Sequence, residues 1–446
     1  MQKNKLYILS IIFCFSLFIG RAAEQQPVSL TIDEAIAFGL ENSKSLHSSL
    51  MKVEYSDAKS GEASALLYPS LKFGGSYTRL SKVDPFQIGP FGPAMPQKIT
   101  VSPSVFDNYN MRLTLQQPLF TGLRLINSSK AASYSAQASE QDYQKDKTDL
   151  IYNITNTYWS LFKAIEFKKV IDENVAQVKA HLKDVQNFFN QGIVTKNEAL
   201  KVEVQLSNVQ VLQIDAQNNV QLTTIGLNSL IGLPLDTKID LTSKAEQKNQ
   251  SYDEVNKLVQ KAMDDRSDMK SMDLRVKAAE SGVAIARAGW FPQIYLVGNY
   301  VYARPNQRIF PTQDKFMDTW DVSISASFDI WNWGTTIHQA DEAQALLAQA
   351  KDGLGLIKDA VTLEVTQSYL NFNQSKERIA VAEKGVSQAE ENYRITDEKF
   401  KAGFALNSDL LDAEAALMQA KFNHVQSLVD FELADARLQK ALGQGK

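Results

Sequence analysis

The sequence predicts a mixed α/β membrane protein, built from two tandem copies of one plan in which a β-hairpin is followed by a long antiparallel coiled coil. Three observations support this prediction. Similar segments recur more than 200 residues apart, apolar residues recur at every seventh position over long stretches, and two shorter stretches alternate apolar with polar residues. Heptads indicate helices that supercoil about each other, and alternation over about ten residues indicates strands with lipid on one face.

The first element, residues 1–22, is interpreted as a secretory signal peptide. Two lysines precede an apolar run of 14 residues that starts at Leu6, and the small residues Gly20 and Ala22 follow it. This run is too short to span a bilayer, so a retained membrane anchor is the less favoured alternative. The only cysteine, Cys14, lies in this segment. We therefore expect no disulfide and no cysteine-ligated metal in the mature chain.

Residues 23–244 and 245–446 are predicted to be two structural repeats, each beginning with a helix. The stretch 46–69 matches 269–292, and both stretches end in an aromatic residue followed by proline. Because self-similarity at a fixed offset is the signature of a repeated architecture, the two halves should share one plan. Further matched pairs are Tyr158 with Tyr369, Phe189 with Phe400, Gly192 with Gly403, and Leu200 with Leu411.

The β-hairpins are predicted at 71–119 and 293–331. Apolar residues alternate strictly with Asp and Ser over 320–330, and less strictly with polar residues over 109–116. Strands of about ten residues can cross an outer membrane at a tilt. Four such strands cannot close a barrel, and open edges are not tolerated in hydrocarbon. Two copies would supply about eight strands and three copies about twelve; the sequence pattern alone does not choose.

Two long helical hairpins are predicted at 123–231 and 335–442. Every seventh residue is apolar over 365–400, which keeps one face of a helix in contact with a partner helix. Helices of nearly seventy residues would extend about 100 Å at about 1.5 Å per residue, which is too long for a globular core. We expect Gly192 and Gly403 to end the first helix of each hairpin as C-caps.

These residues resemble the TolC family of outer-membrane efflux channels. The resemblance runs from Leu30-Thr-Ile-Asp-Glu-Ala-Ile to Ala441-Leu-Gly443, and its most specific motif is Gly403-x-x-x-x-x-Asp409-Leu-Leu-Asp412-Ala. It implies a homotrimer, in which a 12-stranded β-barrel in the outer membrane of a Gram-negative bacterium continues as an α-helical barrel across the periplasm. It also implies docking to a periplasmic adaptor (membrane fusion protein) and an inner-membrane transporter. The chain would then be the passive exit duct of a tripartite efflux or type I secretion system.

The resemblance places the turns of both helical hairpins at the periplasmic end of the channel. Adaptor docking is therefore expected at Gly192, Thr195, Gly403 and Leu406. Each of these residues belongs to one of the two turns.

Asp409, Asp412 and Glu198 are the candidate residues of a periplasmic gate. Asp409 and Asp412 share a helix face, so they are either ordinary carboxylates stabilised at a helix start or, as the resemblance favours, a ring around the pore entrance. The best-known family members latch this end with a Tyr and an Arg, where this chain has Phe400 and Ala405. The polar latch is therefore expected to be absent or rebuilt, and the sequence does not show whether the resting channel is closed.

Trp320, Trp331 and Trp333 lie near the ends of a predicted strand. Such residues could form a sugar-stacking platform, but aromatic residues at strand ends more often form the girdle at a membrane interface. We therefore interpret the three tryptophans as membrane-interface residues.

Other classes of function are less well supported. The four histidines are scattered, no metal-binding or nucleotide-binding motif occurs, and the net charge is −4, so we expect no enzyme activity, no cofactor and no nucleic-acid partner. A periplasmic coiled-coil adaptor would explain the heptads but not the hairpins. A general diffusion porin would explain the strands but not the long helices. Neither the transported substrate nor the transporter class can be inferred from the sequence.

Overall fold

The computed structural model describes residues 27–246 and 250–444, so the predicted signal peptide lies outside the described residues. Within this part the chain forms two compact units, and each unit combines segments from both predicted repeats. The first unit contains residues 27–41, 157–246 and 385–429. The second contains residues 42–156, 250–384 and 430–444. No helix of the described part is long and apolar enough to cross a membrane.

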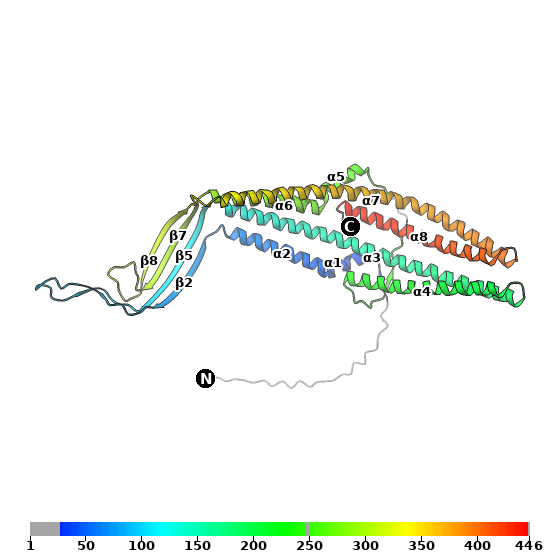
Figure 1. The fold of residues 1–446 in the computed structure, drawn as a ribbon, viewed down its shortest axis with the longest axis horizontal. Coiled ribbons are helices and arrows are strands. Elements are labelled where there is room, and N and C mark those ends of the chain that lie inside the picture. The colour runs from blue at the N-terminus through cyan, green and yellow to red at the C-terminus, as the bar shows by residue number, and fades with distance from the viewer. Residues whose placement is uncertain (1–26, 247–249, 445–446) are drawn as a thin grey trace, which may run out of the picture. The chain divides into compact units, whose positions relative to one another are not determined.

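A four-stranded antiparallel sheet lies in the second unit (Figure 1). Its strands follow the order β2-β5-β7-β8, so β2 and β8 form its two edges. A long connection between β2 and β5 carries a small hairpin of its own. The sheet strands are β2 (Ser70–Arg79), β5 (Asp107–Thr121), β7 (Gln293–Arg304) and β8 (Met317–Ser327), and the small hairpin consists of β3 (Phe86–Ile88) and β4 (Ile99–Ser102).

The strand register separates the sheet into a polar and an apolar face. Residues that are directly opposite one another on neighbouring strands point to the same face. One row across the sheet contains Lys72, Thr114, Asn299 and Asp321, and the next row contains Phe73, Leu113, Tyr300 and Trp320. The predicted alternation along these strands is therefore confirmed, and the apolar face is largely exposed in the single chain.

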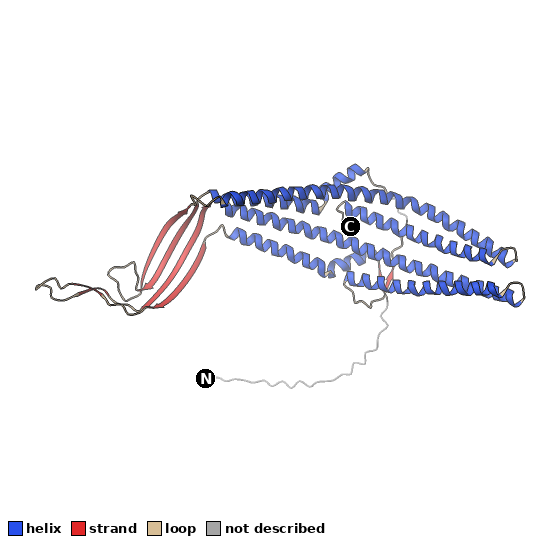
Figure 2. Ribbon diagram, in the orientation of Figure 1, coloured by secondary structure: helices blue, strands red, loops and turns tan. Residues whose placement is uncertain are grey.

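Two very long helices dominate the helical part of the chain (Figure 2). Helices α3 (Arg124–Asn190) and α7 (Thr335–Lys401) each have 67 residues, and α4 (Lys196–Ile231) and α8 (Asn407–Ala441) follow them. The remaining elements are β1 (Val28–Leu30), α1 (Ile32–Asn42), α2 (Lys44–Ala65), β6 (Ile239–Leu241), α5 (Val255–Asp265), α6 (Ser267–Arg287) and the 3₁₀ turn η1 (Ala288–Trp290).

The heptad positions account for much of the buried helical surface. Ile154, Leu161, Val365 and Phe372 are buried, as the seven-residue spacing predicts. The same seven-residue spacing predicts that Phe189 lies in the seam of α3, and this prediction is wrong, because Phe189 is 41% exposed. Its neighbour Phe188 packs against Phe400 instead, with the ring centroids 5.7 Å apart. The last turn of α3 is thus rotated by about one residue relative to the strict heptad.

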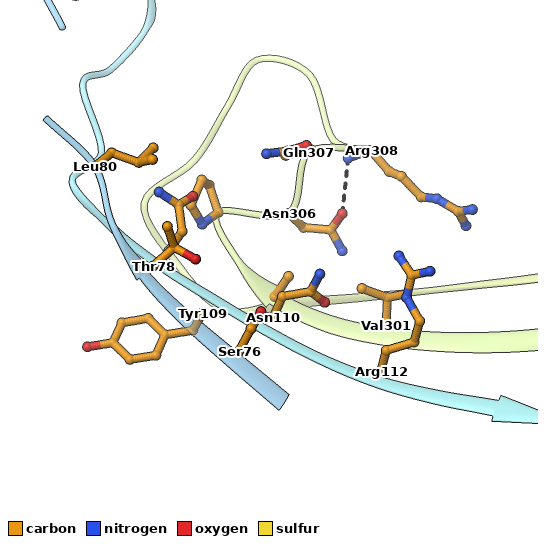
Figure 3. A pocket seen from close by; sticks show the side chains of 13 residues that line it. Ser76, Thr78, Leu80, Tyr109, Asn110, Arg112, Val301, Asn306, Gln307 and Arg308 are labelled. Atoms are coloured by element: carbon orange, nitrogen blue, oxygen red, sulfur yellow. Dashed lines mark hydrogen bonds between the residues drawn. The ribbon is translucent and has the colours of Figure 1, made fainter. Parts of the chain in front are cut away.

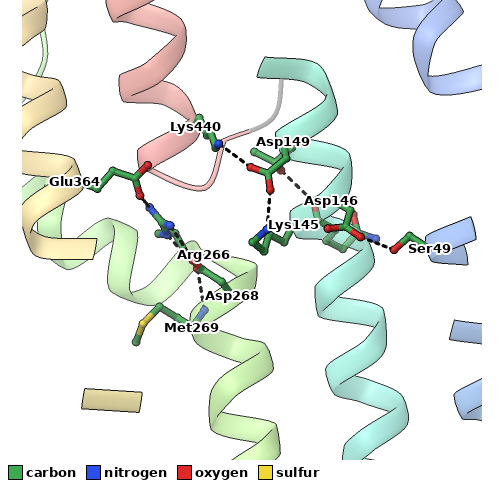
Figure 4. A network of polar contacts seen from close by, with 11 residues as sticks. Ser49, Lys145, Asp146, Asp149, Arg266, Asp268, Met269, Glu364 and Lys440 are labelled. Carbon is green, nitrogen blue, oxygen red and sulfur yellow. Dashed lines mark hydrogen bonds and ion pairs between the residues drawn. The ribbon is translucent and has the colours of Figure 1, made fainter. Parts of the chain in front are cut away.

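A cluster of ion pairs joins four helices of the second unit (Figure 4). The guanidinium of Arg266 lies 2.7 Å from the carboxylates of both Asp268 and Glu364. Although burial alone would lower the pKa of Arg266, hydrogen bonds to these two carboxylates raise it above its ordinary value. Asp149 on α3 accepts from Lys145 at 2.6 Å and from Lys440 of α8 at 2.8 Å. These ion pairs connect α6 with α7 and α3 with α8.

Candidate functional site

The turns between α3 and α4 and between α7 and α8, residues 191–195 and 402–406, are called the hairpin tips below. Gly192 and Gly403 adopt φ values of +73° and +78°, which are left-handed conformations that favour glycine. Ile193 N donates to Phe188 O at 2.9 Å, and Phe404 N donates to Lys399 O at 2.8 Å. Both helices thus end in the same hydrogen-bonded C-cap, and the predicted capping role of the two glycines is confirmed.

Apolar side chains project from both hairpin tips. Phe404 is 85% exposed and Leu406 is 69% exposed, and Ile193 at the first tip is exposed as well. Thr195 precedes α4 with an extended backbone and makes no capping hydrogen bond through its side chain. Neighbouring large apolar residues that face solvent often mark surfaces that contact a partner.

The three predicted gate carboxylates do not form one group in the single chain. Asp409 and Asp412 are exposed on the first turns of α8. Asp409 Oδ2 accepts a hydrogen bond from Leu406 N at 3.2 Å, as a carboxylate at a helix start commonly does. Glu198 on α4 instead accepts from Asn407 Nδ2 at 2.9 Å and from Lys201 Nζ at 2.9 Å. These hydrogen bonds, first from Lys201 and then from Asn407, lower the pKa of Glu198.

The hydrogen bond between Glu198 and Asn407 joins the two hairpins near their tips. The sequence does not predict this contact. Asn407 is buried, and its amide also donates to the backbone oxygen of Glu198 at 3.3 Å. A polar connection between the hairpins is therefore present, although Phe400 and Ala405 replace the Tyr and Arg of the better-known latch.

Sequence reasoning also missed a buried ionisable pair in the first unit. His181 Nδ1 on α3 lies 3.4 Å from Glu414 Oε1 on α8, and both side chains are only 2% exposed. The ring of Phe400 packs edge-on against His181 with centroids 5.2 Å apart. The position of Glu414 was a usable signal, because it lies on the same helix face as the buried residues Leu410 and Leu417. A single charged residue on a coiled-coil face often has a buried partner.

The predicted interface tryptophans lie at both ends of β8. Trp320 is on the apolar face opposite Tyr300, and all three tryptophans are exposed. Trp331 and Trp333 follow β8 with their ring centroids 5.7 Å apart.

A second aromatic cluster, which sequence reasoning missed, lies at the end of the sheet remote from α7. Tyr77, Tyr109, Phe316 and Tyr302 form a chain of ring contacts with successive centroid distances of 5.0, 5.5 and 5.2 Å. Tyr77, Tyr109 and Tyr302 occupy apolar-face positions by register. Aromatic residues thus flank the apolar band at both of its ends, as in the girdles of membrane β-barrels.

No group of three or more potential metal ligands occurs within residues 27–246 and 250–444. The chain offers strands with one apolar face, long helices with apolar seams and two exposed tips. This arrangement is that of a membrane-inserted conduit with a helical extension. The chain belongs to the outer membrane efflux protein family, whose model matches residues 38–233 and 258–444.

Individual relatives are distant but span most of the chain. Outer membrane protein TolC of Escherichia coli K12 is 23% identical over 86% of this chain and 76% of its own length. Alkaline protease secretion protein AprF of Pseudomonas aeruginosa is 22% identical over 75% of this chain and 69% of its own. The solved structure of VceC from Vibrio cholerae superposes with a TM-score of 0.78 at 20% identity and covers 93% of this chain and 96% of that one. The outer-membrane channel OprN gives a TM-score of 0.79 at 16% identity, covering 93% and 90%.

The predicted family and fold class are therefore confirmed. The protein is an efflux channel of the outer membrane of Gram-negative bacteria. The periplasmic adaptor and the general diffusion porin, which the sequence left as alternatives, are not favoured.

Proposed function

We propose that the protein is a homotrimer that forms the passive exit duct of a tripartite efflux or type I secretion system. The observation that carries the proposal is the four-stranded sheet, whose edge strands β2 and β8 each pair on one side only among the described strands. Unpaired strand edges cannot remain in hydrocarbon, so copies of the chain must close the sheet. Three copies give about twelve strands, whereas the smallest single-chain barrels have about eight. The family resemblance favours three copies.

We further propose that the hairpin tips bind a periplasmic adaptor, which connects the channel to an inner-membrane transporter. The exposed Phe404 and Leu406, together with the left-handed turns at Gly192 and Gly403 and the neighbouring Thr195, support this assignment. Transport would be passive and would involve no enzymatic step. One relative is named for alkaline protease secretion and another for pyoverdine export, so the same kind of duct serves different cargoes. Substrate selection would then belong to the transporter.

We propose that residues 23–244 and 245–446 are two structural repeats, each contributing two strands and one helical hairpin. Trp320, Trp331 and Trp333 would lie at the two membrane interfaces. Their exposure on either side of an apolar band of strand residues supports this placement.

Asp409 and Asp412 are proposed to line the periplasmic entrance, with Glu198 holding the two hairpins together nearby. Both aspartates are exposed near the second tip, so three copies would bring six carboxylates to one opening. Carboxylates gathered at a constriction attract cations and raise their local concentration. The resting pore should therefore prefer cations.

Fractionation and mass measurement test the proposed assembly. The protein should sediment with outer membranes, resist extraction by high salt, and run in mild detergent with three times the mass of the mature chain. Recovery in the soluble periplasm, or a monomer or dimer in detergent, would refute the trimeric duct.

Single-channel recording tests the gate. Asp409→Asn combined with Asp412→Asn should reduce cation preference and weaken block by multivalent cations. Asn at 409 can still accept the hydrogen bond from Leu406 N, so the helix start should stay folded. Asp215→Asn, at an exposed carboxylate farther along α4, is the matched control and should change neither property. Unchanged selectivity in the double variant would make both aspartates ordinary helix-start residues.

A further inference from the structure

The start of the loop between β7 and β8, residues 305–308, folds back over the polar face of the sheet, whereas Phe316 at its end packs against rings of the apolar face. Val301 and Ala303 on that face are 8% and 6% exposed, although Ser323, Ser325 and Ser327 on the same face of β8 are exposed. Asn306 at the start of the loop is buried, and its amide donates to Met317 O at 3.1 Å and to Thr319 Oγ1 at 3.2 Å. These bonds fix the loop against the sheet.

A cavity of about 410 Å³ lies between this loop and strands β2, β5 and β7 (Figure 3). Its volume falls within the range of about 300–1,000 Å³ that is typical of small-molecule sites. Its lining is mainly polar and includes Asn110, Arg112, Asn306 and Arg308. Figure 3 shows the side chains of Arg112 and Arg308 extending toward the same side of the cavity.

Only one of the two arginines is paired with a carboxylate of the same face. Arg308 Nη2 lies 2.7 Å from Asp321 Oδ1, and Asp321 Oδ2 accepts a hydrogen bond from Asn299 Nδ2 at 3.0 Å. Arg112 acts on Asp321 through its charge, but it makes no hydrogen bond or ion pair with any residue of the described part. One carboxylate cannot neutralise two guanidinium groups. The cavity therefore carries an excess positive charge with free hydrogen-bond donors.

The rest of the polar face does not offset this charge. By register, the charged residues at its strand positions are Lys72, Arg112 and Asp321. Arg308 from the covering loop adds a third basic residue against the one acidic residue. A wall of one charge sign concentrates ions of the opposite sign.

We propose that this cavity binds a small multivalent anion, of the polycarboxylate or phosphate class, between the guanidinium groups of Arg112 and Arg308. A guanidinium presents paired N–H donors that match carboxylate and phosphate oxygens, and Asp321 holds Arg308 in position for this contact. The cavity is open to water, so binding is weak and falls with ionic strength. The inference rests on the proposed channel, in which the polar face lines the lumen and each of the three subunits carries one such site.

Planar-bilayer recording of the full trimer tests the site with citrate as the probe. Citrate should reduce the conductance of the unmodified channel in a concentration-dependent manner. Arg112→Gln combined with Arg308→Gln should raise the half-blocking citrate concentration about tenfold or more, since charge-assisted hydrogen bonds are lost. Lys72→Gln removes a charge from the same face but does not line the cavity, so it should shift that concentration by no more than about twofold.

The controls separate the site from general effects of charge. An equal loss of block in Lys72→Gln and in the double variant would overturn the site, because diffuse lumenal charge would then explain the block. Arg112→Gln alone breaks no hydrogen bond of the described part, so it provides the decisive measurement if the double variant fails to assemble. Conductance without any citrate block overturns the site but leaves the channel intact. A trimer that conducts no ions overturns the proposed channel as well.

Discussion

The two faces of β8 should respond in opposite ways to the same substitution. Ile324 pairs with Leu296 on the apolar face and is 69% exposed, whereas Ser325 pairs with Tyr295 on the polar face. An arginine facing lipid near the middle of the bilayer costs about 2–4 kcal/mol. Three subunits would bring the total to roughly 6–12 kcal/mol, which is comparable with the whole stability of many domains. Ile324→Arg should therefore abolish trimer assembly, while Ser325→Arg in the water-filled lumen should be tolerated.

The assay measures the yield of trimer in the outer-membrane fraction and its mass in mild detergent. Ile324→Leu is the matched control, because it conserves the volume and the apolar character of the side chain. It should give the same trimer yield as the unmodified protein. Ser325→Arg should also give nearly normal yield, although the added charge in the lumen should change single-channel conductance.

Equal trimer yields from the two arginine variants would refute the assignment of the faces. A loss of trimer in Ser325→Arg alone would indicate that the polar face contacts lipid. The register leaves no intermediate outcome, since successive residues of a strand point to opposite sides of a sheet.

Three further predictions concern the helices. Gly403→Val should abolish efflux but preserve the trimer in detergent: a Cβ at this position has open space around it, so only the left-handed backbone is strained, by about 1–3 kcal/mol. Glu414→Ala should lower the unfolding free energy by about 1–3 kcal/mol, because it leaves the buried imidazole of His181 without its polar neighbour, and Glu414→Leu combined with His181→Phe should recover most of that loss in denaturant titrations. Burial raises the pKa values of Asp149 and Asp268, but hydrogen bonds from lysine or arginine outweigh it, so both pKa values are lowered in the folded protein. The stability that the two carboxylates contribute is complete above the ordinary Asp pKa of about 3.9 and is lost as the pH falls through the lower folded-state values. The melting temperature should therefore decrease when the pH is lowered below about 4, and it should decrease less in Asp268→Asn.

The features that the sequence predicts well are those encoded by local periodicity. A seven-residue apolar repeat shows which face of a helix is buried, even before the partner helix is known. Phe372 and Phe400 lie in such a repeat, and both are buried. Alternation along β8 determines its two faces before any pairing is known. The glycines of the hairpin tips were recognisable because a left-handed cap residue is nearly always glycine.

The missed features depend on contacts between residues that are far apart in the chain. Glu198 and Asn407 are separated by 209 positions, and neither residue type predicts the other. The exchange of Phe188 for Phe189 on the seam reflects a small local rotation at the end of α3, which the heptad count does not contain. The position of residues 305–308 over the polar face rests on amide hydrogen bonds from Asn306, a residue type that is common in any loop.

Two groups of exposed charges of opposite sign lie in different units of the chain. The start of α8 presents the exposed carboxylates of Asp409 and Asp412, whereas the polar face of the sheet carries Arg112 and Arg308 with an excess of basic residues. If both groups line the proposed conduction path, neither one alone determines ion selectivity, because each attracts the ion that the other repels. Neutralising the aspartates should then shift the reversal potential in a salt gradient toward anion preference, and neutralising the arginines should shift it toward cation preference. Raising the ionic strength should reduce both shifts, since at about 1 M salt the electric field of each charge is screened beyond about 3 Å. Shifts of the same sign would mean that one of the two groups lies outside the path.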